Sequence, residues 1–212
     1  TGVKGRIDGG EEQVFKAHRE VVLSAGSIGS PQLLQLSGIG PRPLLEKHGI
    51  AVQKELAGVG ENLQDHLQIR TLYKVSNTTT LNLLYNSLWG KLKMGLQYLL
   101  FKTGPLTMPP SQLGAFARSD PGQASANIEW HVQPLSLDKF GDPLHPFNAI
   151  TPSVCNLRPS SRGHVRIRGT DPDQAPAIAP NYLSTEADRQ VALDGLRFTR
   201  RIMNAKALER FN

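Results

Sequence analysis

The chain of 212 residues carries 24 Lys and Arg against 18 Asp and Glu, a net charge of +6, and 39% of its residues are hydrophobic. Such a chain folds around one sizeable core or contains parts of two domains, and its composition excludes a disordered protein. The basic residues are scattered. The densest group, within residues 158–168, has no aromatic side chains on which bases could stack, so we expect no nucleic-acid partner.

Cys155 is the only cysteine, which excludes an intrachain disulfide and a metal cluster built on cysteines. The single cysteine fits a reducing compartment, and we expect a cytoplasmic protein. No apolar run approaches the roughly 20 residues that span a bilayer. No two of the six histidines share metal-ligand spacing, so we predict no metal site.

Residues 1–18 predict a β-hairpin, with apolar residues on both sides of an Asp8-Gly9 turn. The next apolar run, residues 21–23, does not alternate with polar residues and stops at small ones. This pattern predicts a strand that is buried on both faces, as in a parallel sheet.

A helix is predicted to begin with Ser30 as its N-cap and Pro31 at its first position. A second short helix is predicted over residues 41–48, where Gly49 ends it. The sequence GVGENLQDH, residues 58–66, is predicted to be a polar loop.

Leucines at helical spacing between Leu81 and Phe101 predict a further helix. One interpretation is a helix packed on a domain core. The other is a helix at the surface of the inner membrane, because Trp89 and lysines accompany its apolar face. Gly90 and Gly95 weaken an isolated helix, which favours the packed helix.

Residues 104–180 are rich in proline and turn residues and contain short alternating runs, which predict antiparallel strands. A helix is predicted from Ser184 to Met203, where Thr185 and Asp188 suit a capping box. The expected fold is therefore mixed, with α/β and α+β parts.

The strongest local indication of a ligand site is Ala25-Gly26-Ser27, between the predicted strand and the predicted helix. Ligands of open α/β sheets lie beyond the carboxyl ends of strands, and helix N-termini offer N–H groups to anions. The alternative is an ordinary turn in which Gly26 only permits close packing. GVGENL, residues 58–63, lacks the last glycine of a dinucleotide fingerprint and a preceding buried strand, so we reject it as a phosphate loop.

The stretch GSIGSPQLLQLSGIG, residues 26–40, resembles the second diagnostic motif of the glucose–methanol–choline (GMC) family of flavin oxidoreductases. The similarity continues over most of the chain, in GVGENLQDH (58–66), GAFARSDP (114–121), RPSSRGHVRIRGTDP (158–172) and APNYLSTEAD (179–188).

The resemblance implies an FAD enzyme that oxidises a small-molecule alcohol: hydride passes to the flavin while a histidine takes the hydroxyl proton. In that family the pyrophosphate loop and the catalytic histidine lie outside the segments matched by this sequence. We therefore expect a middle fragment without a catalytic residue, whose partner is the remainder of the same polypeptide. Alone it should be inactive and bind FAD weakly or not at all. The alternative is a stand-alone, non-catalytic binding or structural domain derived from the family.

The resemblance also implies a domain organisation. Residues 1–66 should be part of an FAD-binding, Rossmann-like domain, and residues 67–183 a substrate-binding domain with a mainly antiparallel sheet flanked by helices. Residues 184–212 should form a helix that packs back on one of the two. Ala25, Gly26 and Ser27 should contact the ADP half of FAD.

Gln112 is the candidate substrate residue. Family members that act on choline tend to carry a carboxylate two residues before the glycine of a G-x-F run, and Gln112 occupies that place before Gly114. An amide lacks the charge that complements a quaternary ammonium, although aromatic faces could add cation–π attraction. This favours a neutral alcohol, unless Gln112 only faces solvent. His66 and His131 are expected to have structural roles.

Overall fold

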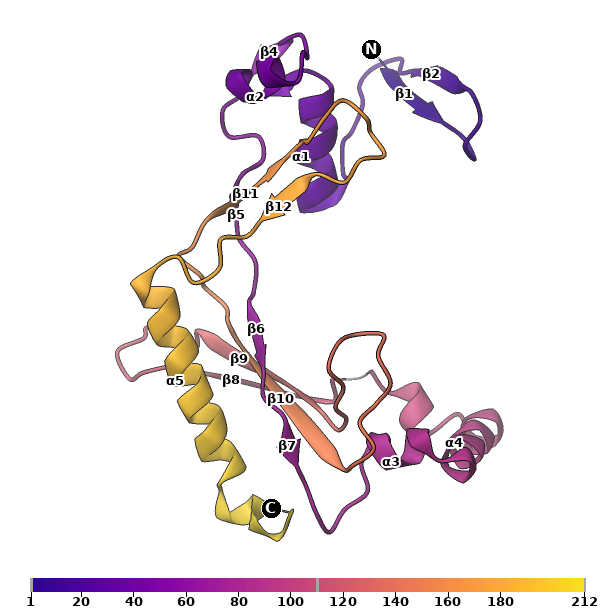
Figure 1. Ribbon diagram of the computed structural model, residues 1–212, viewed down its shortest axis with the longest axis vertical. Helices are drawn as coiled ribbons and strands as arrows, with labels where there is room; N and C mark the ends of the chain where they lie inside the picture. The colour runs from indigo at the N-terminus through magenta and orange to yellow at the C-terminus, as the bar shows by residue number, and fades with distance from the viewer. Residues whose placement is uncertain (1, 110, 212) are drawn as a thin grey trace. The chain divides into compact units, whose positions relative to one another are not determined.

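The computed structural model describes residues 2–109 and 111–211, so Thr1 and Asn212, at the ends of predicted segments, lie outside the described residues. The chain forms two compact units, labelled by element in Figure 1. The first unit joins Thr1–Leu63 with Arg162–Pro180, and the second joins Gln64–Ser161 with Asn181–Asn212. This division differs from the expected boundaries, because residues 162–180 pair with the first segment of the chain.

The first unit begins with the predicted hairpin. Strands β1 (Gly2–Arg6) and β2 (Glu12–Lys16) pair antiparallel along their whole length. At the tip, Asp8 and Gly9 have φ angles of 50° and 71°. Both values are left-handed, which Asp and Gly tolerate better than most residues. The hairpin prediction is therefore confirmed.

The prediction of a buried strand at residues 21–23 is wrong. These residues lie in an irregular segment and are exposed, Val22 by 78%. An extended segment becomes a strand only when its N–H and C=O groups pair with a neighbouring strand. None of the strands in the described ranges pairs with it, and an apolar run by itself cannot supply that partner.

Helix α1 (Gly26–Leu36) begins before the predicted N-cap, Ser30, and contains Pro31 in its interior. The Ser30 hydroxyl still satisfies the helix start, because its Oγ accepts a hydrogen bond from the Ala25 N–H at 3.0 Å. The predicted boundary is therefore wrong: the helix begins earlier, and Ser30 lies one turn inside it, where its hydroxyl accepts from the N–H of the N-cap residue Ala25.

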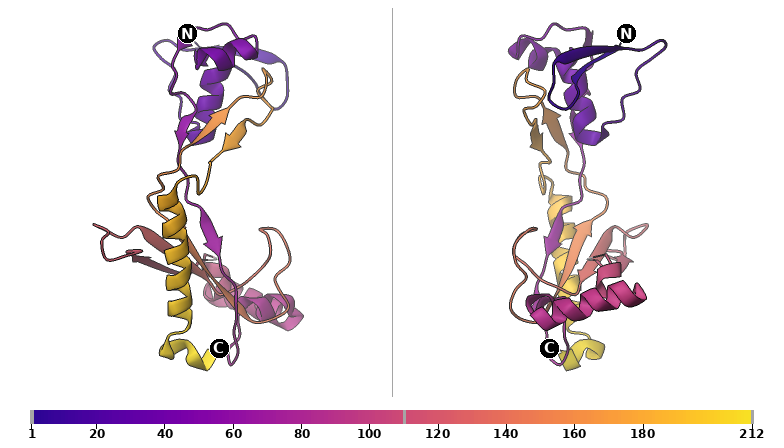
Figure 2. Two further views of the ribbon diagram at one scale, coloured as in Figure 1. Left: turned by 60° about the vertical axis from the view of Figure 1, so that its left-hand side comes forward. Right: turned by 90° about the vertical axis from the view of Figure 1, so that its right-hand side faces the viewer.

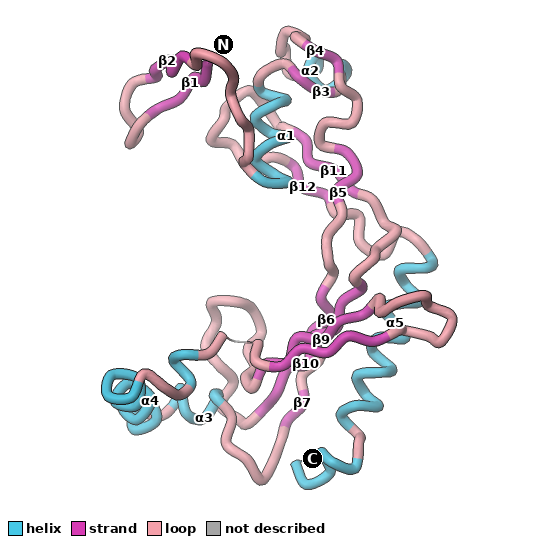
Figure 3. Tube along the Cα trace, turned by 180° about the vertical axis from the view of Figure 1, so that it is seen from behind, coloured by secondary structure: helices cyan, strands magenta, loops and turns pink. Residues whose placement is uncertain are grey.

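The remaining elements of the first unit are short. Helix α2 (Arg42–Lys47) matches the second predicted helix. Strands β3 (Ile39–Gly40) and β4 (Lys54–Glu55) pair in parallel, and β5 (Glu61–Leu63), β11 (Gly163–Arg166) and β12 (Ala177–Ala179) form an antiparallel sheet beside α1 (Figure 3). The polar loop predicted at residues 58–66 is thus partly a strand, because its pairing partner lies far along the sequence.

A buried glutamine occupies the centre of the first unit. Gln35 is 0% exposed, and its Nε2 donates to the carbonyl oxygens of Val59 and Val165 at 3.2 and 3.0 Å. Its Oε1 accepts from the Ile167 N–H at 2.9 Å. The side chain therefore joins α1 to the strand region of residues 162–167 through hydrogen bonds that leave no buried polar atom of the amide unpaired.

The second unit contains the main sheet, which is antiparallel as predicted. Its strand order is β6 (Gln68–Arg70), β10 (Ala149–Asn156), β9 (Ile128–Gln133) and β8 (Leu113–Ala117), and β7 (Tyr73–Lys74) also pairs with β10. Helix α5 (Glu186–Met203) lies against one face of this sheet (Figure 2).

The hydrophobic core of the second unit lies between the sheet and α5. Ile128, Trp130 and Val154 are each at most 2% exposed. The Trp130 Nε1–H donates to Thr199 Oγ1 on α5 at 2.7 Å, so the indole is buried without an unpaired donor. Gly195 allows the close approach of helix and sheet, since a Cβ there would lie 3.0 Å from a Val154 methyl group.

The helix predicted over residues 81–101 is two helices, α3 (Leu81–Asn86) and α4 (Leu88–Phe101). The break falls at Ser87, whose hydroxyl caps α4 by accepting from the Gly90 N–H at 3.3 Å. Only Gly90 and Met94 of α4 are buried, and Trp89 is 80% exposed. The two interpretations of this segment remain predictions.

Two short 3-10 helices, η1 (Pro105–Thr107) and η2 (Lys206–Phe211), complete the second unit. Among the described residues, no helix combines the length and hydrophobicity that a membrane-spanning segment requires.

Candidate functional site

The first candidate site is the start of α1, where Ala25, Gly26 and Ser27 are all exposed. Gly26 has a φ of 76°, and a Cβ built on it would meet no heavy atom within 4 Å. The first N–H groups of a helix have no intrahelical acceptor and carry partial positive charge. The first turn of α1 holds no acidic residue. An open backbone turn of this kind fits a phosphate or pyrophosphate group.

The second candidate site is the side of the main sheet that faces away from α5. Side chains alternate along a strand, so the residues of β9 and β10 between the core residues point to this side. We call it the polar face; from these two strands it comprises Glu129, His131, Gln133, Thr151, Ser153 and Cys155. A buried sheet surface with this many polar groups is suited to bind a polar ligand or ion rather than to pack on a hydrophobic layer.

Glu129 and His131 form the accessible part of the polar face. Glu129 Oε1 and His131 Nε2 are 3.3 Å apart, and the side chains are 17% and 35% exposed. The β10 register places Cys155 opposite Glu129. The β8 register places Phe116 opposite Glu129 and Gly114 opposite His131. Because Gly114 has no side chain, His131 has an uncovered edge.

Gln112 lies beside the polar face. It is exposed, and its N–H donates to the Val132 carbonyl at 3.1 Å, which continues the pairing of β8 with β9. By alternation it lies on the same side of the sheet as Gly114. The structure thus brings the predicted substrate residue to the same surface as His131. Ala25, Gly26 and Ser27 lie in the other unit.

His66 contacts the backbone in the second unit, with its Nε2 3.1 Å from the Leu157 carbonyl oxygen, which agrees with the expected structural role. Its neighbour Asp65 accepts a short hydrogen bond from the Tyr182 hydroxyl. That hydrogen bond, with burial and the carboxylate charge, raises the pKa of Tyr182 to about 12. Tyr182 is therefore a neutral donor at physiological pH.

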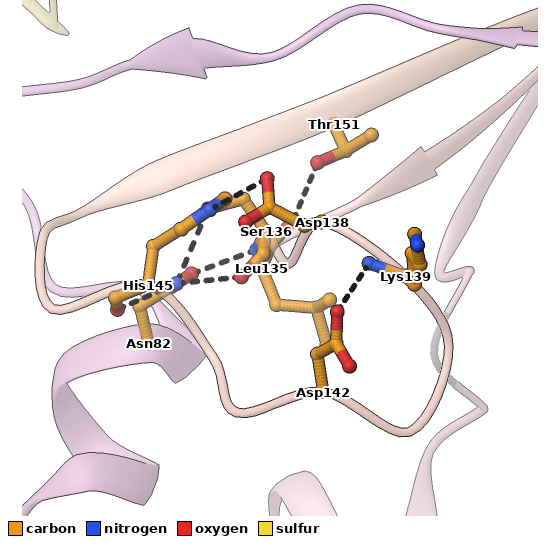
Figure 4. Close-up of polar contacts among 8 residues, drawn as sticks. All are labelled: Asn82, Leu135, Ser136, Asp138, Lys139, Asp142, His145 and Thr151. Atoms are coloured by element: carbon orange, nitrogen blue, oxygen red, sulfur yellow. Dashed lines mark hydrogen bonds and ion pairs between the residues drawn. The ribbon is translucent and has the colours of Figure 1, made fainter.

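Asp138, His145 and Ser136 are arranged in a hydrogen-bonded row, shown in Figure 4. His145 Nε2 lies 3.3 Å from Asp138 Oδ1, and its Nδ1 lies 3.0 Å from Ser136 Oγ. The row resembles a nucleophilic triad, but Ser136 is 0% exposed and its Oγ also accepts a hydrogen bond from Asn82 Nδ2 at 3.2 Å. No substrate can reach that oxygen, so the row stabilises the loop between β9 and β10.

Comparison with known protein families identifies the family to which the chain belongs. Two models described as GMC oxidoreductase match the chain, one over residues 1–68 and the other over residues 159–211. The chain belongs to the GMC oxidoreductase family, as the sequence motifs predict.

Curated relatives include the oxygen-dependent choline dehydrogenase of Photobacterium profundum, which is 42% identical over 95% of this chain and 35% of the relative. The corresponding protein of Pseudomonas entomophila is 38% identical over 100% of this chain and 37% of the relative. The chain therefore spans little more than a third of the length of these relatives.

Solved structures agree on the fold. The crystal structure of a formate oxidase matches 99% of this chain and 41% of its own with a TM-score of 0.88 and 24% identity. A pyridoxine 4-oxidase from Mesorbium loti matches 95% of this chain and 35% of its own, with a TM-score of 0.76 and 25% identity. An FAD-dependent oxidoreductase from Chaetomium thermophilum matches 96% of this chain and 41% of its own, with a TM-score of 0.74 and 25% identity.

The grouping of Glu129 and His131 with Cys155 was missed by sequence reasoning. Glu129 and His131 alternate on one strand, a signal that the sequence contains, but Cys155 comes from another strand, and only the pairing register places it opposite Glu129. The prediction of no metal site rests on histidine spacing and does not take this mixed group into account.

Proposed function

We propose that this chain forms part of an FAD-dependent enzyme that oxidises the CH–OH group of a small alcohol. The observation that carries the proposal is the 38–42% identity to proteins named oxygen-dependent choline dehydrogenase over nearly the whole chain. When bound, FAD would supply the acceptor for the hydride.

In this proposal the start of α1 holds part of the cofactor. The N–H groups of Gly26 and Ser27 would bind a phosphate oxygen of the ADP half, and the absent side chain at Gly26 would let the backbone approach it. The positive φ and the open space at Gly26 support this role.

The polar face of the sheet would bind the alcohol. Gln112 would donate to or accept from the substrate, and Glu129 would supply the negative charge that Gln112 lacks for a quaternary ammonium. Phe116, opposite Glu129 and 64% exposed, could add cation–π attraction. These features support choline as the first substrate to test, with neutral alcohols as the comparison that the amide of Gln112 suggests.

The isolated chain is expected to be inactive, because it accounts for little more than a third of each relative. The test is a chimera in which this chain replaces the matching segment of the Photobacterium profundum choline dehydrogenase. We expect it to bind FAD and to consume oxygen with choline, while the isolated chain with added FAD does neither at stoichiometric level.

A folded chimera with full flavin content that oxidises neither choline nor a neutral alcohol would contradict the proposal. A Glu129→Gln chimera sharpens the result on substrate. It should lose activity with choline by roughly tenfold or more and keep it with a neutral alcohol of similar size, since about 1.4 kcal/mol of lost charge interaction corresponds to tenfold.

A further inference from the structure

Three different donor side chains come together on the polar face. The carboxylate of Glu129, the imidazole of His131 and the thiol of Cys155 each offer one ligand atom, and these atoms all lie within 4.8 Å of one another. Two of the donors alternate on β9, and the third lies opposite Glu129 on β10. The antiparallel hydrogen bonds of the two strands hold all three backbone positions in place.

The group is open on one side and closed on the other. Cys155 is 2% exposed and forms the floor, whereas the side chains of Glu129 and His131 are 17% and 35% exposed. Gly114, opposite His131 on β8, adds no side chain above the ring. Glu129 and His131 are therefore the donors that an ion from solvent meets first, with the Cys155 thiol beneath them.

We propose that Glu129, His131 and Cys155 bind one divalent transition-metal ion of the zinc type. Zn²⁺ takes thiolate, imidazole and carboxylate ligands in a tetrahedral arrangement, whereas Mg²⁺ and Ca²⁺ require oxygen ligands. Tetrahedral Zn²⁺ ligands lie roughly 3–4 Å apart. The 3.3 Å separation of Glu129 Oε1 and His131 Nε2 already meets this spacing. Three protein ligands leave a fourth position for water.

Charge balance supports the same ion. A Zn²⁺ ion bound by one thiolate, one carboxylate and a neutral imidazole gives a neutral group, which suits a half-buried position. When Zn²⁺ binds, the Cys155 thiol releases its proton to solvent as the Zn–S bond forms.

This site does not depend on the proposed function, because it needs neither flavin nor alcohol. The metal proposal and the proposed function can be contradicted independently, because metal binding is tested on the 212-residue chain alone and alcohol oxidation on the chimera. In the chimera a bound metal ion would neutralise Glu129 and occupy the face proposed for the alcohol, so the choline assays are made on metal-free protein.

The experiment titrates the purified chain with Zn²⁺ in competition with a chromophoric chelator, and separately with Co²⁺ followed by absorption. We expect one Zn²⁺ per chain, no displacement by millimolar Mg²⁺, and a thiolate-to-cobalt charge-transfer band in the near ultraviolet. Cys155→Ser should abolish that band, and His131→Ala should weaken Zn²⁺ binding at least tenfold. His164→Ala, a strand histidine of the first unit, should change neither.

Absence of stoichiometric Zn²⁺ binding, or binding that His131→Ala leaves unchanged, would overturn the proposal. Because Cys155 is buried, its variant could unfold, so its circular dichroism is compared with that of the parent chain. His131→Ala and Glu129→Gln change side chains that are less buried than Cys155, and they keep the proposal falsifiable if Cys155→Ser does not fold. A cobalt complex without the charge-transfer band would show that Cys155 is not a ligand.

Discussion

The two units of the chain differ in what stabilises them. The second unit encloses a hydrophobic core between α5 and the main sheet, with Ile128, Trp130 and Val154 nearly inaccessible. The first unit is organised around the amide of Gln35, and half of its large apolar side chains are exposed, among them Val14 by 64% and Val22 by 78%. Hydrophobic burial is the dominant stabilising contribution to folding. The first unit therefore depends more than the second on a few specific hydrogen bonds.

Trp130→Ala should have the largest effect on this comparison. The indole is 2% exposed and donates to Thr199 Oγ1, so its loss leaves a cavity in the core and removes that hydrogen bond, while the Thr199 hydroxyl still donates to the Gly195 carbonyl. We expect the free energy of unfolding of the second unit to fall by about 3–5 kcal/mol. Urea denaturation followed by circular dichroism measures it.

Trp89→Ala is the matched control, since Trp89 is 80% exposed and its removal should change the unfolding free energy by less than about 0.5 kcal/mol. Equal effects of the two substitutions would show that the sheet and α5 do not form the stabilising core.

Gln35→Ala tests the other side of the comparison. It leaves the carbonyls of Val59 and Val165 and the N–H of Ile167 without the partner that each has in the amide. We expect a loss on the order of 3 kcal/mol in the first unit, because each unpaired buried group costs about 1–3 kcal/mol. Hydrogen exchange resolved by peptide should show faster exchange in residues 35–63 and 162–180. The protection of β9 and β10 should not change.

Gln32→Ala serves as the control for this helix, because Gln32 donates to Pro172 and Gln174 carbonyls in an exposed part of the same unit. Its effect should be well below 1 kcal/mol, since exposed carbonyls can bind water instead. Loss of protection in both units after Gln35→Ala would show that they unfold together.

The contrast between the units also explains which elements the sequence could predict. The hairpin at residues 2–16 and helix α5 carry local signals, a turn pair and a 3.6-residue period with a Thr185 cap, and both are confirmed. β5 and the donor group that includes Cys155 depend on partners about 100 and 25 positions away, which no local pattern reports. Residues 21–23 show the opposite case. Their apolar run predicts a strand, but no neighbouring strand in the described part of the chain pairs with them.

Asp188 provides a test of the second unit by pH. Its carboxylate accepts from the N–H groups of Ser160 and Ser161, both at 2.8 Å. Burial alone would raise its pKa, but the hydrogen bonds from these serines lower the pKa to about 2. A lowered native-state pKa stabilises the fold above the ordinary value near 4, and that stabilisation is lost as pH falls toward 2.

We therefore expect the unfolding free energy of the second unit to decrease by on the order of 2 kcal/mol between pH 5 and pH 2 through this group. Asp188→Asn should lower stability at pH 7 and flatten the profile in this window. Asp194→Asn, on the same helix, should leave the slope unchanged. A slope that persists in Asp188→Asn would assign the acid sensitivity to other carboxyl groups.

Gly26→Ala has the smallest expected effect on stability and addresses the exposed start of α1 in the first unit. A Cβ would meet no atom there, so the only cost is the left-handed φ of 76°, about 1 kcal/mol. Gly5→Ala is the matched control, because that position is equally open and its φ is not left-handed.

If the turn binds the ADP half of FAD, the methyl group added by Gly26→Ala should also lower FAD affinity in the chimera tenfold or more, measured by fluorescence titration. Backbone strain present with and without FAD cancels from that affinity. A Gly26→Ala chimera that loses stability and keeps its affinity would therefore limit Gly26 to a role in the turn itself, and the first unit would then contribute its hydrogen-bonded frame but no cofactor contact at this point.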